Sequence, residues 1–206
     1  MIHRRAVLRV PLLFPGALVP PLTAAWSQTL VVPSPVIDDL SDITGLSALG
    51  TRWQLVTDQV MGGVSQGTLA REEVAGRPAL VMRGDVRLEN NGGFVQMALD
   101  LARSDAPGSG TLDARYWQGL EIDVYGAPQS YSLHLRTTDL ERPWQSYRQG
   151  FPARLEWHRL RLLFADFTPY RTVVPLDLSQ LRRLGIVAIG RAFKADLAVG
   201  GVRFYG

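Results

Sequence analysis

The side chains that could carry out catalysis are few and widely spaced in this sequence. The chain has no cysteine, so it has neither a thiol nucleophile nor a disulfide framework. Beyond the first 25 residues the histidines are His134 and His158, and neither belongs to an HxH or HExxH pattern that would bind zinc. Ser65 has no adjacent histidine to act as its base. The sequence therefore predicts no catalytic site, no metal and no cofactor.

Scattered carboxylates are the pattern that would allow a hydrolase. Hydrolysis of a glycosidic bond requires two carboxylates that flank the bond. The acids considered for this role are Asp58, Asp85, Glu89, Glu121 and Asp123. Glu121 and Asp123 alternate along one strand-like segment and share a face, where their charges repel each other, so we expect water to solvate them. An exported glycoside hydrolase is therefore the least favoured of the functions considered.

Two glycine-rich segments are the most distinctive feature of the sequence. Trp53–Gly67 reads WQLVTDQVMGGVSQG, and Leu88–Phe94 reads LENNGGF. In each, a strand-like piece runs into a glycine pair, which allows positive φ and the close approach of a backbone or a ligand. The motif residues of the two turns are Asp58, Met61, Gly62, Gly63, Ser65, Glu89, Asn90, Asn91, Gly92 and Gly93. These turns either contact a ligand or only close tight corners between strands, with Asp58 capping backbone amides.

A cluster of aromatic and basic residues follows later in the chain. His134 and Arg136 project from the same face of one strand-like segment, and Trp144, Tyr147 and Arg148 come shortly after it. Such side chains on a sheet face can stack on a sugar ring or anchor a protein partner. We take these five residues as the candidate binding face. The alternative is that Trp144 and Tyr147 only cover the edge of the fold.

The first 25 residues have the pattern of an export signal. A basic start, MIHRRAVLR, precedes an apolar stretch, and Thr23-Ala24-Ala25 offers small residues for cleavage. RRAVL resembles a bacterial twin-arginine signal, with an ordinary secretory signal or an uncleaved anchor as the alternatives. Prolines in the apolar stretch argue against a continuous spanning helix. We predict an exported, periplasmic protein that meets the membrane only through this leader, if the leader stays uncleaved.

The positive net charge comes from the same leader. Residues 1–25 contain three arginines and no acid, and without them the chain holds as many basic as acidic residues, 19 of each. A strongly basic surface is the electrostatic footprint of nucleic-acid binding. The sequence therefore predicts no nucleic-acid partner.

After the leader, the sequence predicts a linker at 26–35 and a single β-sandwich domain at 36–206. About nine short segments alternate apolar and polar residues between Gly and Pro turns, which is typical of strands in a sandwich or barrel. No long segment has helical periodicity, so the fold class is all-β. One helical turn is expected within Leu178–Arg183, capped by Asp177. Ile186–Ile189 is continuously apolar and is predicted to be a central strand.

The glycine motifs also carry a family resemblance. DQVMGGVSQG, followed about twenty residues later by LENNGGF, resembles the signature of the complex I intermediate-associated protein 30 family. WQGLEIDVYG, YSLHLRT and LRRLGIVAI resemble further blocks, so the resemblance covers almost the whole domain. It implies a galactose-binding-like jelly-roll sandwich. It also implies assembly work, because the mitochondrial members act as chaperone-like factors in building respiratory complex I. The loop at 102–114 and the RPW insert at 142–144 depart from the family pattern.

The resemblance predicts a non-enzymatic, protein-binding assembly factor, whose partner would be a respiratory complex or another envelope complex. The alternative is a periplasmic carbohydrate-binding module, which the fold analogy and the aromatic cluster favour. The two functions differ in ligand, while both would use an exposed binding surface without a chemical step.

Overall fold

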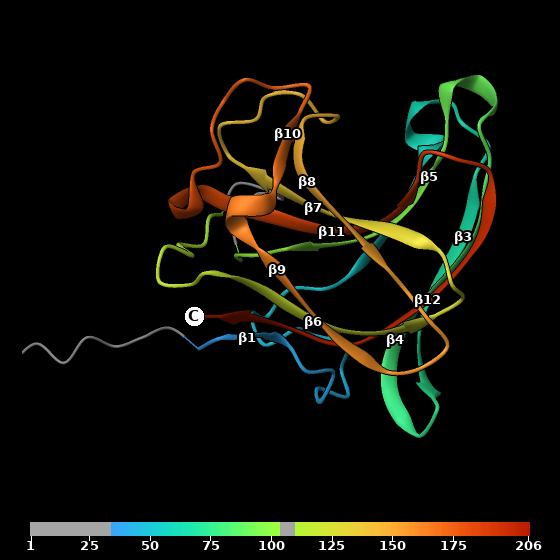
Figure 1. Ribbon diagram of the computed structural model, residues 1–206, viewed down its shortest axis with the longest axis horizontal. Helices are drawn as coiled ribbons and strands as arrows, with labels where there is room; N and C mark the ends of the chain where they lie inside the picture. Colours follow the sequence, from blue (N-terminus) through green and yellow to red (C-terminus); the bar gives the residue numbers. More distant parts are fainter. Residues whose placement is uncertain (1–33, 104–109) are drawn as a thin grey trace, which may run out of the picture. The chain divides into compact units, whose positions relative to one another are not determined.

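Antiparallel strands make up almost all regular structure in the residues that the computed structural model describes, 34–103 and 110–206 (Figure 1). The strands in these ranges are β1 (Val36–Asp38), β2 (Gln54–Thr57), β3 (Gln66–Val74), β4 (Arg77–Val86), β5 (Phe94–Asp100), β6 (Gly119–Gly126), β7 (Ser130–Thr137), β8 (Ser146–Pro152), β9 (His158–Leu163), β10 (Thr168–Tyr170), β11 (Leu181–Ile189) and β12 (Phe193–Tyr205). Four short 3-10 turns accompany them: η1 (Asp58–Met61), η2 (Glu89–Asn91), η3 (Phe164–Asp166) and η4 (Leu178–Gln180). The predicted leader and most of the predicted linker lie outside the described residues.

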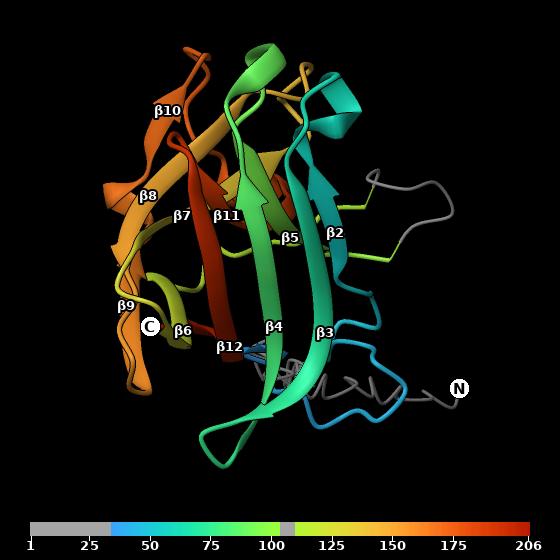
Figure 2. The same ribbon diagram turned by 90° about the vertical axis from the view of Figure 1, so that its right-hand side faces the viewer.

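The strands form two six-stranded sheets (Figure 2). Sheet A has the order β3-β4-β12-β6-β9, and β1 pairs with β12 beside β4. Sheet B has the order β10-β8-β7-β11-β5-β2. Most neighbouring strands are distant in the sequence, so hairpin connections alone do not build either sheet. This arrangement is the predicted all-β sandwich.

Strand alternation sends one face of each sheet into a shared hydrophobic core. In sheet B, Leu133 and Leu135 of β7 lie opposite Ile186 and Leu184 of β11, and all four are fully buried. Met82, Leu120, Ile122 and Leu197 pack against them from sheet A. Because successive side chains of a strand point to opposite faces, His134 lies on the face of sheet B that is turned away from the core.

Several sequence-based expectations about individual elements are confirmed. The apolar Ile186–Ile189 belongs to β11, which lies between β7 and β5 in the interior of sheet B. Asp177 caps η4, since its carboxylate accepts a hydrogen bond of 2.8 Å from the backbone N–H of Ser179. The prediction of about nine strands was too low for the described residues. One strand that was missed is β10, whose three residues include Pro169 and are too few to show alternation.

The expectation that water solvates Glu121 and Asp123 is wrong. Both side chains are buried on the outer face of sheet A, beneath arginines from β9 and β12. Arg161 lies 2.9 Å from Glu121, and Arg203 lies 3.1 Å from Glu121 and 3.0 Å from Asp123. The two like charges are tolerated on one strand because the neighbouring strands supply opposite charges at the same level.

No helix in residues 34–103 or 110–206 is long and apolar enough to cross a membrane. The same residues contain no group of three or more His, Asp and Glu side chains that could hold a metal ion.

Candidate ligand-binding groove

The two glycine turns meet around the carboxylate of Asp58. Asp58 is fully buried, and it accepts hydrogen bonds from the backbone N–H of Ser65 at 2.9 Å and of Phe94 at 3.3 Å. It also accepts from the Gly93 N–H and the Ser65 hydroxyl. Burial raises the pKa of Asp58, but these hydrogen bonds outweigh it and hold the pKa below its ordinary value. One carboxylate therefore joins two segments that are 35 residues apart.

The glycine pairs are explained by this carboxylate. In each pair one glycine has a positive φ, +86° at Gly62 and +123° at Gly93. The other glycine packs on Asp58: a Cβ atom added at Gly63 or Gly92 would lie closer than 3.0 Å to its side chain. Asp58 and Ser65 thus have a structural role inside the turns. Figure 2 shows η1 and η2 side by side at one end of the sheets.

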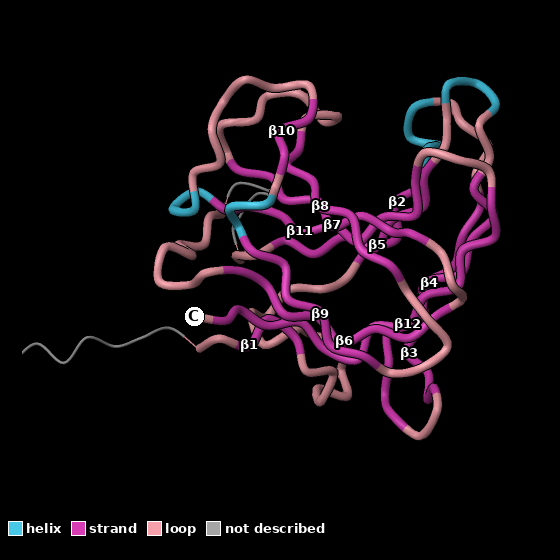
Figure 3. Tube along the Cα trace, in the orientation of Figure 1, coloured by secondary structure: helices cyan, strands magenta, loops and turns pink. Residues whose placement is uncertain are grey.

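A groove of about 630 Å³ runs over the face of sheet B that is turned away from the core. In Figure 3 the turns η1 and η2 rise on one side of this sheet, and the loops next to β8 and β10 rise on the other. The floor residues share a position on the outer face of sheet B and comprise Phe94, Gln96, His134, Arg136, Arg148, Arg183, Gly185, Val187 and Ile189. The side chain of Gln96 lies over Gly185 in the middle of the floor, since a Cβ atom added at Gly185 would lie 2.6 Å from the Gln96 side-chain nitrogen.

The first wall comes from the glycine turns. Val60 and Met61 of η1 line it together with Gly92 and Gly93. Val60 is 71% exposed and Met61 is 53% exposed, so the hydrogen bonds of Asp58 hold two aliphatic side chains in solvent at the edge of the groove. Exposed aliphatic side chains beside a groove are typical of an interaction site.

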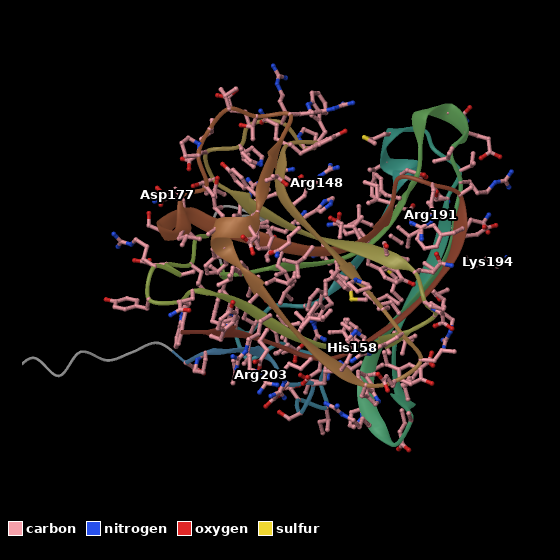
Figure 4. The ribbon with its side chains drawn as sticks, in the orientation of Figure 1. Arg148, His158, Asp177, Arg191, Lys194 and Arg203 are labelled. Atoms are coloured by element: carbon pink, nitrogen blue, oxygen red, sulfur yellow. The ribbon has the colours of Figure 1, made fainter. Side chains whose placement is uncertain are left out.

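The second wall is aromatic and basic. It contains Trp144 from the β7–β8 loop, which is 45% exposed, and Tyr170 at the end of β10, which is 37% exposed. The guanidinium of Arg148 stacks on the Tyr170 ring at 3.4 Å from its centroid, and Arg171 approaches the same ring at 5.4 Å. Figure 4 shows Arg148 between the two groups of loops.

Two floor residues have polar atoms without partners. His134 is 8% exposed, and its Nε2 atom has no hydrogen-bond partner in the described part of the chain. Burial, with a further contribution from Arg148, lowers the pKa of His134 to about 3, so the ring is neutral. Arg136 donates to the carbonyls of Arg142 at 3.0 Å and Leu140 at 3.3 Å, while its Nε is unpaired within those same residues. Buried polar groups are normally hydrogen-bonded, so these two buried atoms are exceptions beneath the groove.

The structure brings most of the candidate binding face into this groove. His134, Arg136, Trp144 and Arg148 line it. Tyr147 does not: it is fully buried, and its hydroxyl donates to the carbonyls of Val174 and Pro175 at 3.1 and 2.9 Å. Tyr147 was predicted to belong to the binding face and does not. Successive residues of a strand point to opposite faces, so Tyr147 points into the core and Arg148 points out of it.

The motif residues of the glycine turns divide in the same way. Met61, Gly92 and Gly93 line the groove, whereas Asp58 and Ser65 are buried beneath it. Gly62, Gly63, Glu89 and Asn90 are not among the groove residues. Asn90 has a φ of +59°, the left-handed conformation that asparagine tolerates.

Several groove residues were not predicted from the sequence. Phe94 and Gln96 alternate on β5, and this alternation could have placed them on one outer face. Tyr170 and Arg171 carried no comparable signal, because they belong to or follow the short β10. Arg183 lies at the groove only because β11 pairs between β7 and β5.

The two sheets, with a groove that has an aromatic wall and a polar floor, define a β-sandwich protein with a candidate ligand-binding groove. A family model described as Complex I intermediate-associated protein 30 (CIA30) matches residues 43–199. The chain therefore belongs to the CIA30 family, and the resemblance noted from the glycine motifs is confirmed. No curated protein sequence matches the chain.

Solved structures with a similar fold include carbohydrate-binding modules. A family 11 module from Clostridium thermocellum, in complex with a β-1,3-1,4-mixed-linked tetrasaccharide, has a TM-score of 0.64 and 10% sequence identity; the match covers 84% of this chain and 95% of the module. A family 30 module of a cellulosomal cellulase from the same organism has a TM-score of 0.57 and 16% identity, covering 85% of this chain and 98% of the module. These likenesses confirm the predicted galactose-binding-like jelly-roll sandwich.

Proposed function

We propose that this CIA30 protein is a non-catalytic binding module that holds an oligosaccharide in the groove over sheet B. The observation that carries this proposal is the second wall, where Trp144 and Tyr170 expose aromatic rings beside a polar floor. Aromatic faces stack on sugar rings, and a side chain such as Gln96 can hydrogen-bond sugar hydroxyls. The tetrasaccharide bound to the family 11 module supports a sugar ligand by analogy of fold.

A binding role without a chemical step agrees with the placement of the acids. No Asp or Glu is among the residues that line the groove. Asp58 is fully buried beneath the glycine turns, and Glu121 and Asp123 belong to sheet A, where arginines cover them. A pair of carboxylates flanking a bound sugar, which glycoside hydrolysis requires, is not found among these groove residues.

Truncation of the aromatic wall tests the proposal. We expect Trp144→Ala to weaken oligosaccharide binding about tenfold or more. The sugar ring would lose its stacking contact with the indole, which contributes about 1.4 kcal/mol to the binding free energy. Binding is screened on an array of neutral and acidic oligosaccharides and then measured by titration calorimetry. The matched control is Tyr116→Ala, which removes an exposed aromatic side chain outside the groove. Failure of every sugar to bind, or equal losses in both variants, would refute the proposal.

We also propose that the protein acts in the periplasm. The support is the leader pattern at residues 1–25, which resembles a twin-arginine signal. A glycan ligand is compatible with that compartment. Cells that express either the full chain or a variant with Arg4 and Arg5 both changed to lysine are fractionated. The wild-type chain tests the location, and the variant tests the route.

A second candidate function is the assembly of a protein complex. Family membership supports it, and so do the aliphatic side chains Val60 and Met61, which suit a protein surface better than a sugar. We expect a pull-down of the tagged full chain from its own cell envelope to recover subunits of a respiratory complex or of another envelope complex. The double variant Val60→Ser, Met61→Ser should lose these subunits, while Tyr116→Ala should retain them. Recovery that is equal for both variants would contradict a role of this wall.

A further inference from the structure

The groove is lined by positive charge without matching negative charge. Four arginines line it, and no acid is among the lining residues. Arg183 is neutralised, because its guanidinium lies 2.7 Å from the Asp100 carboxylate on the neighbouring strand. Arg136, Arg148 and Arg171 make no ion pair with a carboxylate of residues 34–103 or 110–206. Most arginines on sheet A, by contrast, are paired with acids.

The free charges are held in place. Arg148 donates from Nε to the Ser146 hydroxyl at 2.9 Å, and its guanidinium lies over the Tyr170 ring. Arg171 has a φ of +53°, an unusual conformation for a residue with a side chain, and also approaches Tyr170. Arginines that are fixed beforehand lose little conformational entropy on binding.

Burial makes the charges of Arg136 and Arg148 costly when the groove is empty. It lowers the pKa of Arg148 from its ordinary value. Burial, together with the charges of Arg182 and Arg183, lowers the pKa of Arg136 to about 10. An anion in the groove would offset this cost.

We propose that the groove selects acidic oligosaccharides, whose sugar rings carry carboxylates, over neutral ones. This inference depends on the proposed sugar-binding function and names its ligand class. The sugar ring would stack on Trp144 or Tyr170, and its carboxylate would accept paired hydrogen bonds from the planar guanidinium of Arg148 or Arg171. An acidic peptide would satisfy the arginines, but it would leave the exposed Trp144 ring without a flat partner.

Titration calorimetry with two ligands of equal length tests this selection. Tetragalacturonate and its methyl ester have the same rings and linkages, and they differ in charge. We expect the acid to bind about tenfold or more tightly than the ester, and its affinity to fall as NaCl rises from about 50 to about 500 mM. Arg148→Gln and the more exposed Arg171→Gln should each remove most of this preference. Lys194→Gln, which removes one charge from sheet A (Figure 4), should preserve it.

The outcomes separate the two proposals. Equal binding of acid and ester, or binding of neutral glucans alone, would overturn the charge selection and leave sugar binding intact. Binding of no sugar would overturn both. Binding of poly-glutamate without any sugar, lost in Arg148→Gln, would also overturn both and would favour an acidic protein partner. If Arg148→Gln does not fold, Arg171→Gln and the salt dependence of the wild-type protein still decide the question.

Discussion

Asp58→Ala is expected to lower the free energy of unfolding by about 4 kcal/mol, because it would leave several buried hydrogen-bond donors without a partner. The donors are the N–H groups of Ser65, Gly93 and Phe94 and the Ser65 hydroxyl. A loss of this size is a large share of the stability of an ordinary domain. In thermal unfolding followed by circular dichroism, Tm should fall by roughly 10 °C.

Asp42→Ala is the matched control for this substitution. The carboxylate of Asp42 also accepts hydrogen bonds from a backbone N–H and a hydroxyl, both of Thr44, but Asp42 is exposed and its carboxylate does not bridge distant segments. Its Tm should stay close to that of the wild type. A Tm for Asp58→Ala that is also close to the wild-type value would show that the carboxylate does not hold the two turns together.

Because Asp58 is ionisable, its contribution to the free energy of unfolding depends on pH. Its folded-state pKa lies below the ordinary value, so the stabilisation is present at pH values above the ordinary pKa of about 4 and is lost as the pH falls through the folded-state value. The loss of stability in Asp58→Ala should therefore shrink in strong acid. Because Met61 belongs to the same turn, ligand binding by the folded fraction of the variant should weaken as well.

His134 is expected to make the protein less stable in mild acid. Its folded-state pKa is about 3, whereas an unfolded histidine has a pKa of about 6.5. Between these two values the unfolded chain takes up a proton that the folded protein excludes, so stability falls as the pH falls below about 6.5. From about pH 7 to about pH 5 this one residue should cost about 2 kcal/mol.

His134→Gln isolates this effect, because glutamine is polar and does not titrate. Urea unfolding at a series of pH values should show that the wild type loses about 2 kcal/mol more than the variant between pH 7 and pH 5, while the difference between them is constant above pH 7.5. The charged groups that line the groove with His134 are Arg136, Arg148 and Arg183, and Arg136, whose pKa is about 10, keeps its charge in this range. Parallel curves for the two proteins throughout would mean that His134 is not protected from protonation.

The sequence by itself determined the fold class and much of the candidate site. Alternation of apolar and polar residues is a local property of a strand, and it placed His134 and Arg136 together on one outer face. The glycine pairs were readable because few residues other than glycine adopt the required backbone conformations. The family could be recognised for the same reason, because the glycine turns are the most specific part of its sequence signature.

Only the tertiary structure decided which faces are buried and which segments meet. Asp58 joins turns that are 35 residues apart, and Tyr170 reaches the groove through the short strand β10. Tyr147 was placed on the wrong face because the sequence around it does not show which residues alternate inward. Glu121 and Asp123 were expected in water, and arginines from distant strands cover them instead. Such outcomes depend on strand pairing between distant segments, and local sequence does not encode which strands become neighbours.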